Sequence, residues 1–220
     1  MRKGKKMGKY KAVLFDFDGT LMNTNNLIMG SWQHLFRTLT GKNGDEEKIL
    51  KSFGETLAYS MTHMFPDHDP QECIDIYRQW QKTRYAEEIE VFPGMAELIA
   101  ELDKRGYKLA MVSSRTHGSM KDGLRQFGLL DYFDAVLGCD DGLEAKPSPQ
   151  PALFTLEQLG VRPEEAVFVG DTKFDIGCAQ NAGVTSVLVG WSQFCESCKE
   201  SEFPPDYVIE KASDLLGILE

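Results

Sequence analysis

The sequence predicts an α/β fold, a doubly wound parallel sheet with an inserted all-helical cap. Short apolar runs without polar alternation are typical of strands covered on both faces. These runs alternate with helical patterns over most of the chain, which indicates parallel strands joined by right-handed crossovers. A block of helical patterns at residues 23–90 interrupts this alternation directly after the first strand.

The first strand is predicted at residues 12–15, where the run AVLF contains no polar residue. The helical block follows, with apolar residues at helical spacing in 24–40, in 44–64 and in 71–88. The middle stretch is broken at Phe53-Gly54. An insertion at this place would hang over the ends of the strands, where a cap excludes water and selects substrates.

The α/β alternation resumes at residue 92. The predicted elements are a helix from 93 that ends before Gly106, a strand at 107–112, a helix around 120–127, a strand at 135–137, a helix at 149–160, a strand at 166–169, a helix ending near 183, and strands at 185–189 and 207–209. The expected division is therefore an α/β catalytic core of residues 1–22 and 91–220 and a helical cap of residues 23–90.

Polar side chains follow three of the predicted strands. Asp16 and Asp18 follow the first strand, Ser113 follows the strand at 107–112, and Asp171 follows the strand at 166–169. Lys146 lies just before a predicted helix. Because ligands of open parallel sheets bind outside the carboxyl ends of the strands, we expect these groups to converge.

Asp16 and Asp18 are two residues apart, so in an extended chain their side chains project to the same side. Two carboxyl groups this close resist joint ionisation unless a cation lies between them or one keeps its proton. One can then act as a nucleophile or metal ligand and the other as a general acid. The alternative is a turn after a strand with two solvated carboxylates.

Four segments, in this order, resemble the motifs of the haloacid dehalogenase superfamily of phosphohydrolases. They are DxDGTL at 16–21, the strand-end Ser113, Lys146-Pro147, and GDxxxD at 170–175. The resemblance covers nearly the whole chain and is nearest to the helical-cap, phosphoglycolate phosphatase-like branch. Asn23-Thr24-Asn25 resembles the pyrophosphatase-type members of that branch, which have Asn where many relatives carry Asp.

The resemblance implies a nucleophile, an acid and a metal site. Asp16 would attack phosphorus and form an aspartyl-phosphate, and Asp18 would protonate the leaving group and later activate water. Mg²⁺, which prefers oxygen ligands, would be held by Asp16, Asp171 and the main-chain carbonyl of Asp18, with Asp175 acting through water.

The resemblance also implies groups that hold the phosphoryl oxygens. These are the backbone amides near Phe17, Ser113 and the region of Ser114, while Lys146 would balance the charge on Asp16. Structural alternatives remain at this stage. Ser113 and Asp175 have the composition of helix starts, and Lys146 that of a surface charge.

Two further sets of residues are candidates for substrate contact. Glu55 and Thr56 follow the glycine-containing break in the helical block, which would reach the leaving group if it dips towards the site and would otherwise be an exposed turn. Arg115 follows the predicted strand-end serines, as a substrate contact or as a solvated loop residue.

Composition narrows the partners. The net charge of −10 argues against general nucleic-acid binding, and no apolar run reaches the ~18 residues of a membrane span. We therefore expect a cytoplasmic protein, a monomer or weak dimer, with a small phosphate as its partner.

The basic residues at 2–11 indicate a solvated tail or a contact with an anion. Cys195 and Cys198 form a lone CxxC, expected as solvated or partly packed thiols rather than as a zinc or redox site.

The predicted function is a Mg²⁺-dependent phosphohydrolase for a small phosphate of the phosphoglycolate or pyrophosphate type. A β-phosphoglucomutase-like mutase shares the motifs. A receiver-like module and a catalytically silent phosphate-binding module are the alternatives from another class. A dehalogenase is disfavoured because carbon–halogen chemistry has no use for the acid Asp18.

Overall fold

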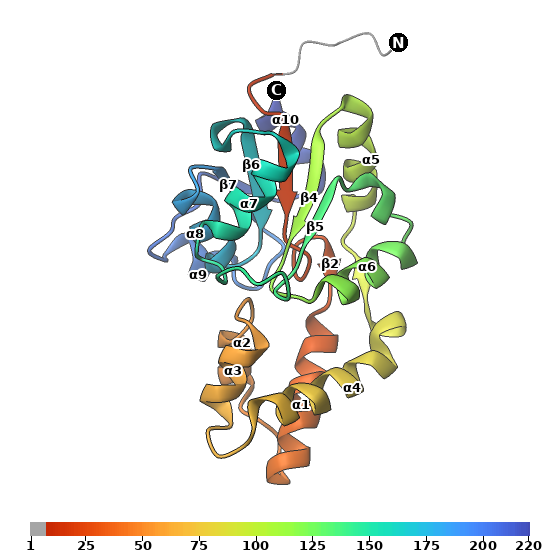
Figure 1. The fold of residues 1–220 in the computed structure, drawn as a ribbon, viewed down its shortest axis with the longest axis vertical. Helices are drawn as coiled ribbons and strands as arrows, with labels where there is room; N and C mark the ends of the chain where they lie inside the picture. Colours follow the sequence, from red (N-terminus) through yellow and green to blue (C-terminus); the bar gives the residue numbers. More distant parts are fainter. Residues whose placement is uncertain (1–7) are drawn as a thin grey trace.

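The computed structural model describes residues 8–220, and the basic residues at 2–6 lie outside them. Its main sheet has six parallel strands in the order β5-β4-β1-β6-β7-β8 (Figure 1). The strands are β1 Ala12–Phe15, β4 Lys108–Val112, β5 Ala135–Leu137, β6 Ala166–Gly170, β7 Thr185–Val189 and β8 Tyr207–Ile209.

The strand order places a topological switch point beside β1. From β1 the chain builds the sheet outward through β4 and β5, then crosses to β6 on the other side and continues to β8. Phe15 is in register with Met111 of β4 and Val169 of β6, so the three strands end at the same level. This edge is where open parallel sheets bind their ligands.

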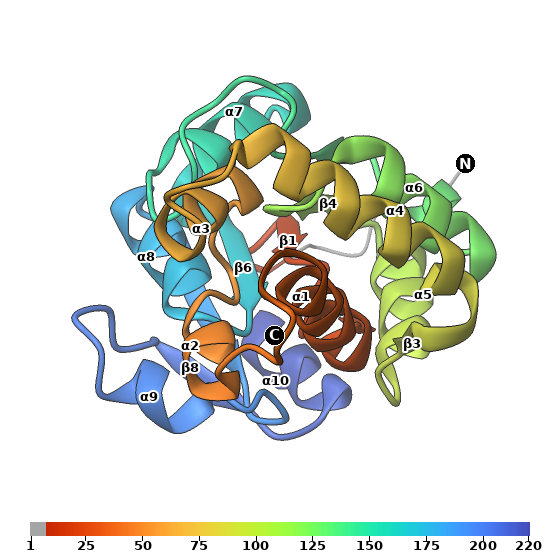
Figure 2. The same ribbon diagram turned by 90° about the horizontal axis from the view of Figure 1, so that it is seen from below.

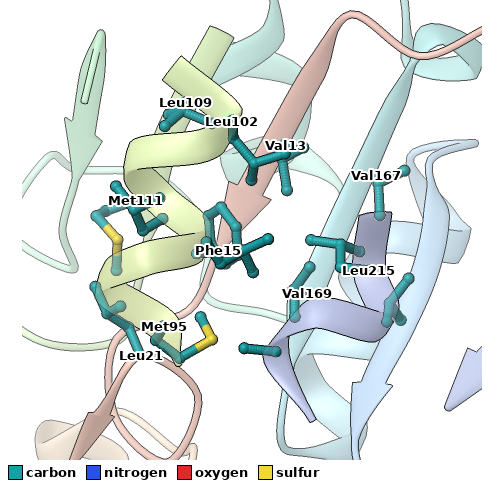
Figure 3. Close-up of a cluster of buried hydrophobic side chains, with 14 of the residues drawn as sticks. Val13, Phe15, Leu21, Met95, Leu102, Leu109, Met111, Val167, Val169 and Leu215 are labelled. Carbon is teal, nitrogen blue, oxygen red and sulfur yellow. The ribbon is translucent and has the colours of Figure 1, made fainter. Parts of the chain in front are cut away.

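Helices cover both faces of the sheet. One face packs against α5 Met95–Arg105, α6 His117–Gln126 and α10 Leu215–Leu219, and the other against α7 Gln150–Leu159 and α8 Lys173–Asn181. Because side chains alternate along a strand, Val13 and Phe15 belong to the first cluster and Leu14 to the second. Figure 3 shows Phe15 among the side chains of α5 and α10 in the first cluster.

The helical block forms a separate layer beyond the carboxyl ends of the strands (Figure 1). It consists of α1 Asn25–Thr40, α2 Glu46–Lys51, α3 Leu57–Met64 and α4 Pro70–Glu88. Figure 2 views the molecule from this side, with α1, α3 and α4 in front of β1 and β6. The block has its own apolar cluster around Trp32, Met61 and Tyr77. That separate core supports the predicted division between cap and catalytic core, which stays a prediction.

Two short elements escaped the sequence analysis. β2 Met22–Asn23 pairs antiparallel with β3 Glu90–Val91, so that both connections between the two layers run side by side. A two-residue strand has no periodic signal that a sequence pattern can reveal. The short helix α10 at the carboxyl end was also not predicted, although Leu215 and Leu219 are buried against α5 and the sheet.

The CxxC motif lies on the short helix α9 Cys195–Lys199. Both thiols are buried beside Ile176 and Leu188, so the expectation of solvated thiols is wrong and that of packed ones is right. All five cysteines are free. Within residues 8–220, no helix has the length and apolar character needed to cross a membrane.

Candidate active site

Three carboxylates meet at the carboxyl ends of β1 and β6. Asp16 directly follows β1, Asp171 directly follows β6, and Asp175 lies in the first turn of α8. Each contributes an oxygen to a group in which all of these atoms lie within 4.8 Å of one another. All three side chains are buried, which is unusual for carboxylates unless they are paired or bind a metal.

Lys146 is the cation of this group. Its Nζ donates to Asp16 Oδ1 at 2.9 Å, to Asp175 Oδ1 at 2.5 Å and to the carbonyl oxygen of Val112 at 3.2 Å. Burial disfavours the charged form, but the two carboxylates outweigh it and raise the pKa of Lys146 above its ordinary value. Lys146 is thus not a surface charge, and its ammonium joins residues that are far apart in the sequence.

Asp175 has two structural tasks at once. Its Oδ2 accepts from the backbone amide and the hydroxyl of Thr172, at 2.9 and 2.7 Å, which closes a capping box at the start of α8. Its Oδ1 accepts from Lys146. Both sequence interpretations of Asp175 therefore hold: Oδ2 stabilises the start of α8, and Oδ1 belongs to the site.

The acidic group fits a hard divalent cation. Asp171 Oδ1 is buried and has no hydrogen-bond partner, an arrangement that is costly unless a ligand supplies one. A Cβ at Gly19 would overlap the Asp171 carboxylate, so the backbone after Asp18 passes close to the same place. Oxygen atoms from a few carboxylates and the main chain are the ligands that Mg²⁺ takes in proteins.

Burial and the close approach of these carboxylates raise the pKa of two of them, Asp16 and Asp171. Burial, together with the charges of Asp175 and Asp18, raises the pKa of Asp16 from 3.8 to about 7 in spite of Lys146. Burial and the neighbouring carboxylates also raise the pKa of Asp171 well above its ordinary value. A bound divalent cation would reverse both effects, because it favours the charged forms.

Asp18 contacts Arg115 and Thr24, which lies where the chain enters the cap. Its carboxylate accepts from Thr24 Oγ1 at 2.6 Å and from Arg115 Nη2 and Nε at 2.8 and 2.9 Å. The side chain of Arg115 is only 7% exposed, so it is not a solvated loop residue. Arg115 Nη1 donates further to Gln81 Oε1 of α4 at 3.2 Å, so Arg115 links Asp18 and the core to the cap.

The strand-end serines have different partners. Ser113 Oγ accepts from the backbone amide of Arg115 at 3.4 Å, and α6 begins only at His117, so Ser113 is not a helix cap. Ser114 Oγ donates to the carbonyl oxygen of Gly54 at 3.0 Å and so holds the cap instead of facing the site freely. Among the described residues, the backbone amides of Phe17 and Ser114 donate to no acceptor, which leaves them available to an anion.

A cavity of about 820 Å³ lies between cap and core above these groups. Glu55 and Thr56 line it, together with Asp16, Arg115 and Lys146. Their loop is no exposed turn, because Gly54 contacts Thr172 and Phe174 of the core. Glu55 itself accepts from Ser60 Oγ at 2.7 Å within the cap.

Sequence reasoning did not identify Arg78, Gln81 and Lys82 of α4 as cavity residues, nor Thr24 as a partner of Asp18. The sequence pattern of α4 indicated packing only, because it places Cys73, Ile74, Tyr77 and Trp80 on one side of the helix. The one available signal was the pair of cations at 78 and 82, spaced by one helical turn.

A parallel sheet that gathers buried carboxylates, a lysine and free amides below a helical cap is typical of a phosphohydrolase. More particularly, the chain belongs to the haloacid dehalogenase-like hydrolases, since the model of that family matches residues 13–189. The expected family, fold class and enzyme class are thereby confirmed.

Individual relatives agree with this assignment. The chain is 36% identical over 211 residues to pyrophosphatase PpaX of Bacillus cereus (strain AH820), an alignment that covers 96% of this chain and 97% of the relative. A Lactobacillus plantarum structure described as a phosphoglycolate phosphatase has a TM-score of 0.81 and 25% identity, with 95% and 99% coverage. CbbY from Rhodobacter sphaeroides, solved in complex with phosphate, also has a TM-score of 0.81 and 25% identity, with 96% and 99% coverage.

Proposed function

We propose that this phosphohydrolase is Mg²⁺-dependent and hydrolyses a small soluble phosphate, pyrophosphate or phosphoglycolate, through an aspartyl-phosphate on Asp16. One observation carries the proposal. Asp16 lies on the cavity with Oδ1 paired to Lys146, while its Oδ2 accepts no hydrogen bond among the described residues. A carboxylate held by one oxygen and free at the other is suited to nucleophilic attack.

In the proposed reaction, hydrolysis takes place as two successive displacements at phosphorus. Asp16 attacks phosphorus, the bond from phosphorus to the leaving oxygen breaks, and Asp18 gives that oxygen its proton. Asp18 then takes a proton from a water molecule, whose oxygen attacks the aspartyl-phosphate, so that phosphate leaves and Asp16 is restored. Lys146 compensates the charge near Asp16, and the amides of Phe17 and Ser114 donate to the phosphoryl oxygens.

The metal would be held by Asp16, Asp171 and the main-chain carbonyl of Asp18, with Asp175 acting through water. When bound, Mg²⁺ neutralises charge on the phosphoryl oxygens and so allows an anionic nucleophile to approach. Asp175 Oδ2 already closes the capping box, which supports an indirect role for this residue.

The choice of substrate rests on the relatives. PpaX, with alignment over nearly the full length of both chains, is named a pyrophosphatase, so pyrophosphate is the first compound to test. The Lactobacillus structure makes phosphoglycolate the second. A cytoplasmic location and a monomer or weak dimer stay predictions.

The test is phosphate release by the purified protein with Mg²⁺ from pyrophosphate, phosphoglycolate and hexose phosphates. We expect release from at least one of the first two. Interconversion of hexose phosphates without release would instead identify a mutase. The variant Asp16→Asn removes the nucleophile's charge at nearly constant shape and should lose turnover by at least about 10³-fold, in the range of lost covalent catalysis. Substantial hydrolysis by folded Asp16→Asn would contradict the aspartyl-phosphate.

A further inference from the structure

Two cations of the cap helix α4 face the cavity without a partner. Arg78 and Lys82 are one helical turn apart, line the cavity and are exposed. Neither forms an ion pair or a side-chain hydrogen bond with any described residue. Arg84 of the same helix differs, because it pairs with Glu88 and lies away from the cavity.

The position of these cations relative to the reacting groups follows from their neighbours. Gln81, between them in sequence, accepts from Arg115, which in turn binds the acid Asp18. On the core side, Cys139 of the loop after β5 lines the same cavity as Arg78. The two cations therefore flank a cap residue that contacts Arg115, the partner of Asp18, and Asp18 is the acid that the proposed function assigns to the leaving group.

With a divalent ion bound, the charges at the cavity floor would be balanced without Arg78 and Lys82. Among residues 8–220, the four carboxylates of Asp16, Asp18, Asp171 and Asp175 are accompanied by two side-chain cations, Lys146 and Arg115, each of which contacts a carboxylate. A bound divalent ion supplies the remaining two charges. Arg115 is committed to Asp18, so the floor has no free cation for a second anionic group on the substrate.

The walls carry little opposing charge near the two cations. The acidic wall residues are Glu55, whose carboxylate accepts from Ser60, and Asp122, which pairs with Arg125. On a free surface, exposed cations such as these need no partner, but Arg78 and Lys82 lie on a cavity wall. A pair of unpartnered cations on the wall of a cavity, next to a neutralised floor, is suited to bind an anion.

We propose that Arg78 and Lys82 bind a second anionic group in the leaving part of the substrate, which restricts the substrate class to phosphates with such a group. The second phosphate of pyrophosphate and the carboxylate of phosphoglycolate both qualify. This inference rests on the proposed function and names residues that select its substrate.

The test compares the double variant Arg78→Ala/Lys82→Ala with the wild type on two kinds of substrate. Pyrophosphate and phosphoglycolate leave as groups with an additional negative charge, whereas p-nitrophenyl phosphate does not. We expect kcat/KM for the first two to fall by at least about 10-fold, as for lost charge-assisted hydrogen bonds, and to stay within about twofold for the third. Arg78→Lys, which keeps the charge, should retain most of the activity.

Arg84→Ala is the matched control, since it removes one cation from the same helix outside the cavity. It should leave all three substrates unchanged, and thermal unfolding should show that every variant is folded. Equal losses on all three substrates would overturn the inference, because the cations would then serve the transferred phosphoryl group or the cap. Unchanged activity of the double variant would overturn it as well.

A binding measurement separates this inference from the proposed function. The dissociation constants of methylenediphosphonate, which resists hydrolysis, and of inorganic phosphate are measured with Mg²⁺ present. The double variant should bind methylenediphosphonate at least about 10-fold more weakly and bind phosphate nearly as before. This outcome would support the inference even if Asp16→Asn had disproved the aspartyl-phosphate. Equal weakening of both ligands would contradict it.

Discussion

At the scale of single residues, the site is a set of buried charges that compensate one another. Taking Lys146, Asp16 and Asp175 out of water is costly, and well-packed apolar residues would often be at least as stable. Structural stability alone therefore does not explain why this cluster is buried. In the proposed mechanism, this cluster provides the nucleophilic carboxylate, a cation and the metal ligands for one phosphoryl group.

The variant Lys146→Met tests, through the free energy of unfolding, whether Lys146 compensates the buried carboxylates. The change leaves the Asp16 and Asp175 carboxylates without their cation, and removing one partner of a buried ion pair costs about 3–5 kcal/mol. We expect the free energy of unfolding of the metal-free protein to fall by that order at pH 8, measured by denaturant titration.

The pH dependence of this loss has a defined sign. Without Lys146 the pKa of Asp16 should rise further, and an acid whose folded pKa exceeds its unfolded pKa weakens the fold as the pH rises. The loss should therefore shrink as the pH falls below 7. Lys51→Met is the control, because Lys51 is exposed and pairs only with Glu47. A Lys146→Met loss as small as that of the control would show that Lys146 is not needed for compensation.

At the scale of elements, the sequence predicted what depends on local pattern. The apolar runs at 12–15 and 166–169 are strands, and the polar residues after them converge because parallel strands end at one edge. The partners of Arg115 and Ser114 were not predictable. Arg115 contacts Asp18 and Gln81, and Ser114 contacts Gly54, through the packing of cap on core, which no sequence period encodes.

The loop between α2 and α3 is the element that joins the cap to the site. Gly54 has a φ of 88°, and a Cβ there would lie 2.8 Å from Phe174 Cδ2 and 3.0 Å from Thr172 Oγ1. Gly54→Ala should therefore push the cap away from the core and lower kcat/KM by about 10-fold or more, since closure completes the site.

Gly41→Ala provides a matched control for backbone strain. Gly41 has a φ of 72° at the end of α1 and nothing within 4 Å of an added Cβ. Both variants should lose about 1 kcal/mol of stability from the left-handed conformation, but only Gly54→Ala should lose activity. Equal kcat/KM values for the two variants would show that the approach of Gly54 to the core has no role in catalysis.

Glu55 and Thr56, next in the loop, line the cavity and should affect substrate choice. We expect Glu55→Ala/Thr56→Ala to change the ratio of kcat/KM among phosphate esters, because discrimination is differential binding of the transition state. The affinity for Mg²⁺ should stay the same, because the predicted ligands lie on the core. If substrate ranking and rates stay within a factor of about two, well under the tenfold that corresponds to 1.4 kcal/mol, the loop has no role in selection.

At the scale of the whole molecule, the cap rests on the core at several separate places. Tyr85 of α4 donates to the carbonyl oxygen of Ser119 at 2.7 Å, and Gln126 of α6 donates to that of Ala86 at 2.9 Å. Together with the β2–β3 pair and the loop at Gly54, these contacts join the cap to the core at several separate places. Opening of the cap would break these contacts, which makes it a candidate for the slow step.

The proposed metal would connect the stability of the whole fold to the chemistry of the site. A ligand that binds only the folded state stabilises it by an amount that grows with its concentration relative to the dissociation constant. Mg²⁺ should therefore raise the melting temperature, and excess EDTA should abolish phosphate release until Mg²⁺ is restored. Ca²⁺, which takes more ligands in looser geometry, should raise the melting temperature and support little turnover. Full activity in excess EDTA would contradict a metal requirement.

The stability of the metal-free protein should also depend on pH in a direction set by Asp16. The pKa of this carboxyl rises from its ordinary value of 3.8 to about 7 in the fold. At a pH between these two values, the folded state therefore binds more protons than the unfolded state. Its contribution to the free energy of unfolding is complete below pH 4 and is lost as the pH rises through 7. We expect Mg²⁺ to offset this loss, because the cation takes the place of the proton among the carboxylates. Asp16→Asn cannot titrate at this position, so the metal-free variant should lose less stability than the wild type between pH 5 and pH 8. Equal losses in the two proteins would show that Asp16 does not hold a proton in the metal-free fold.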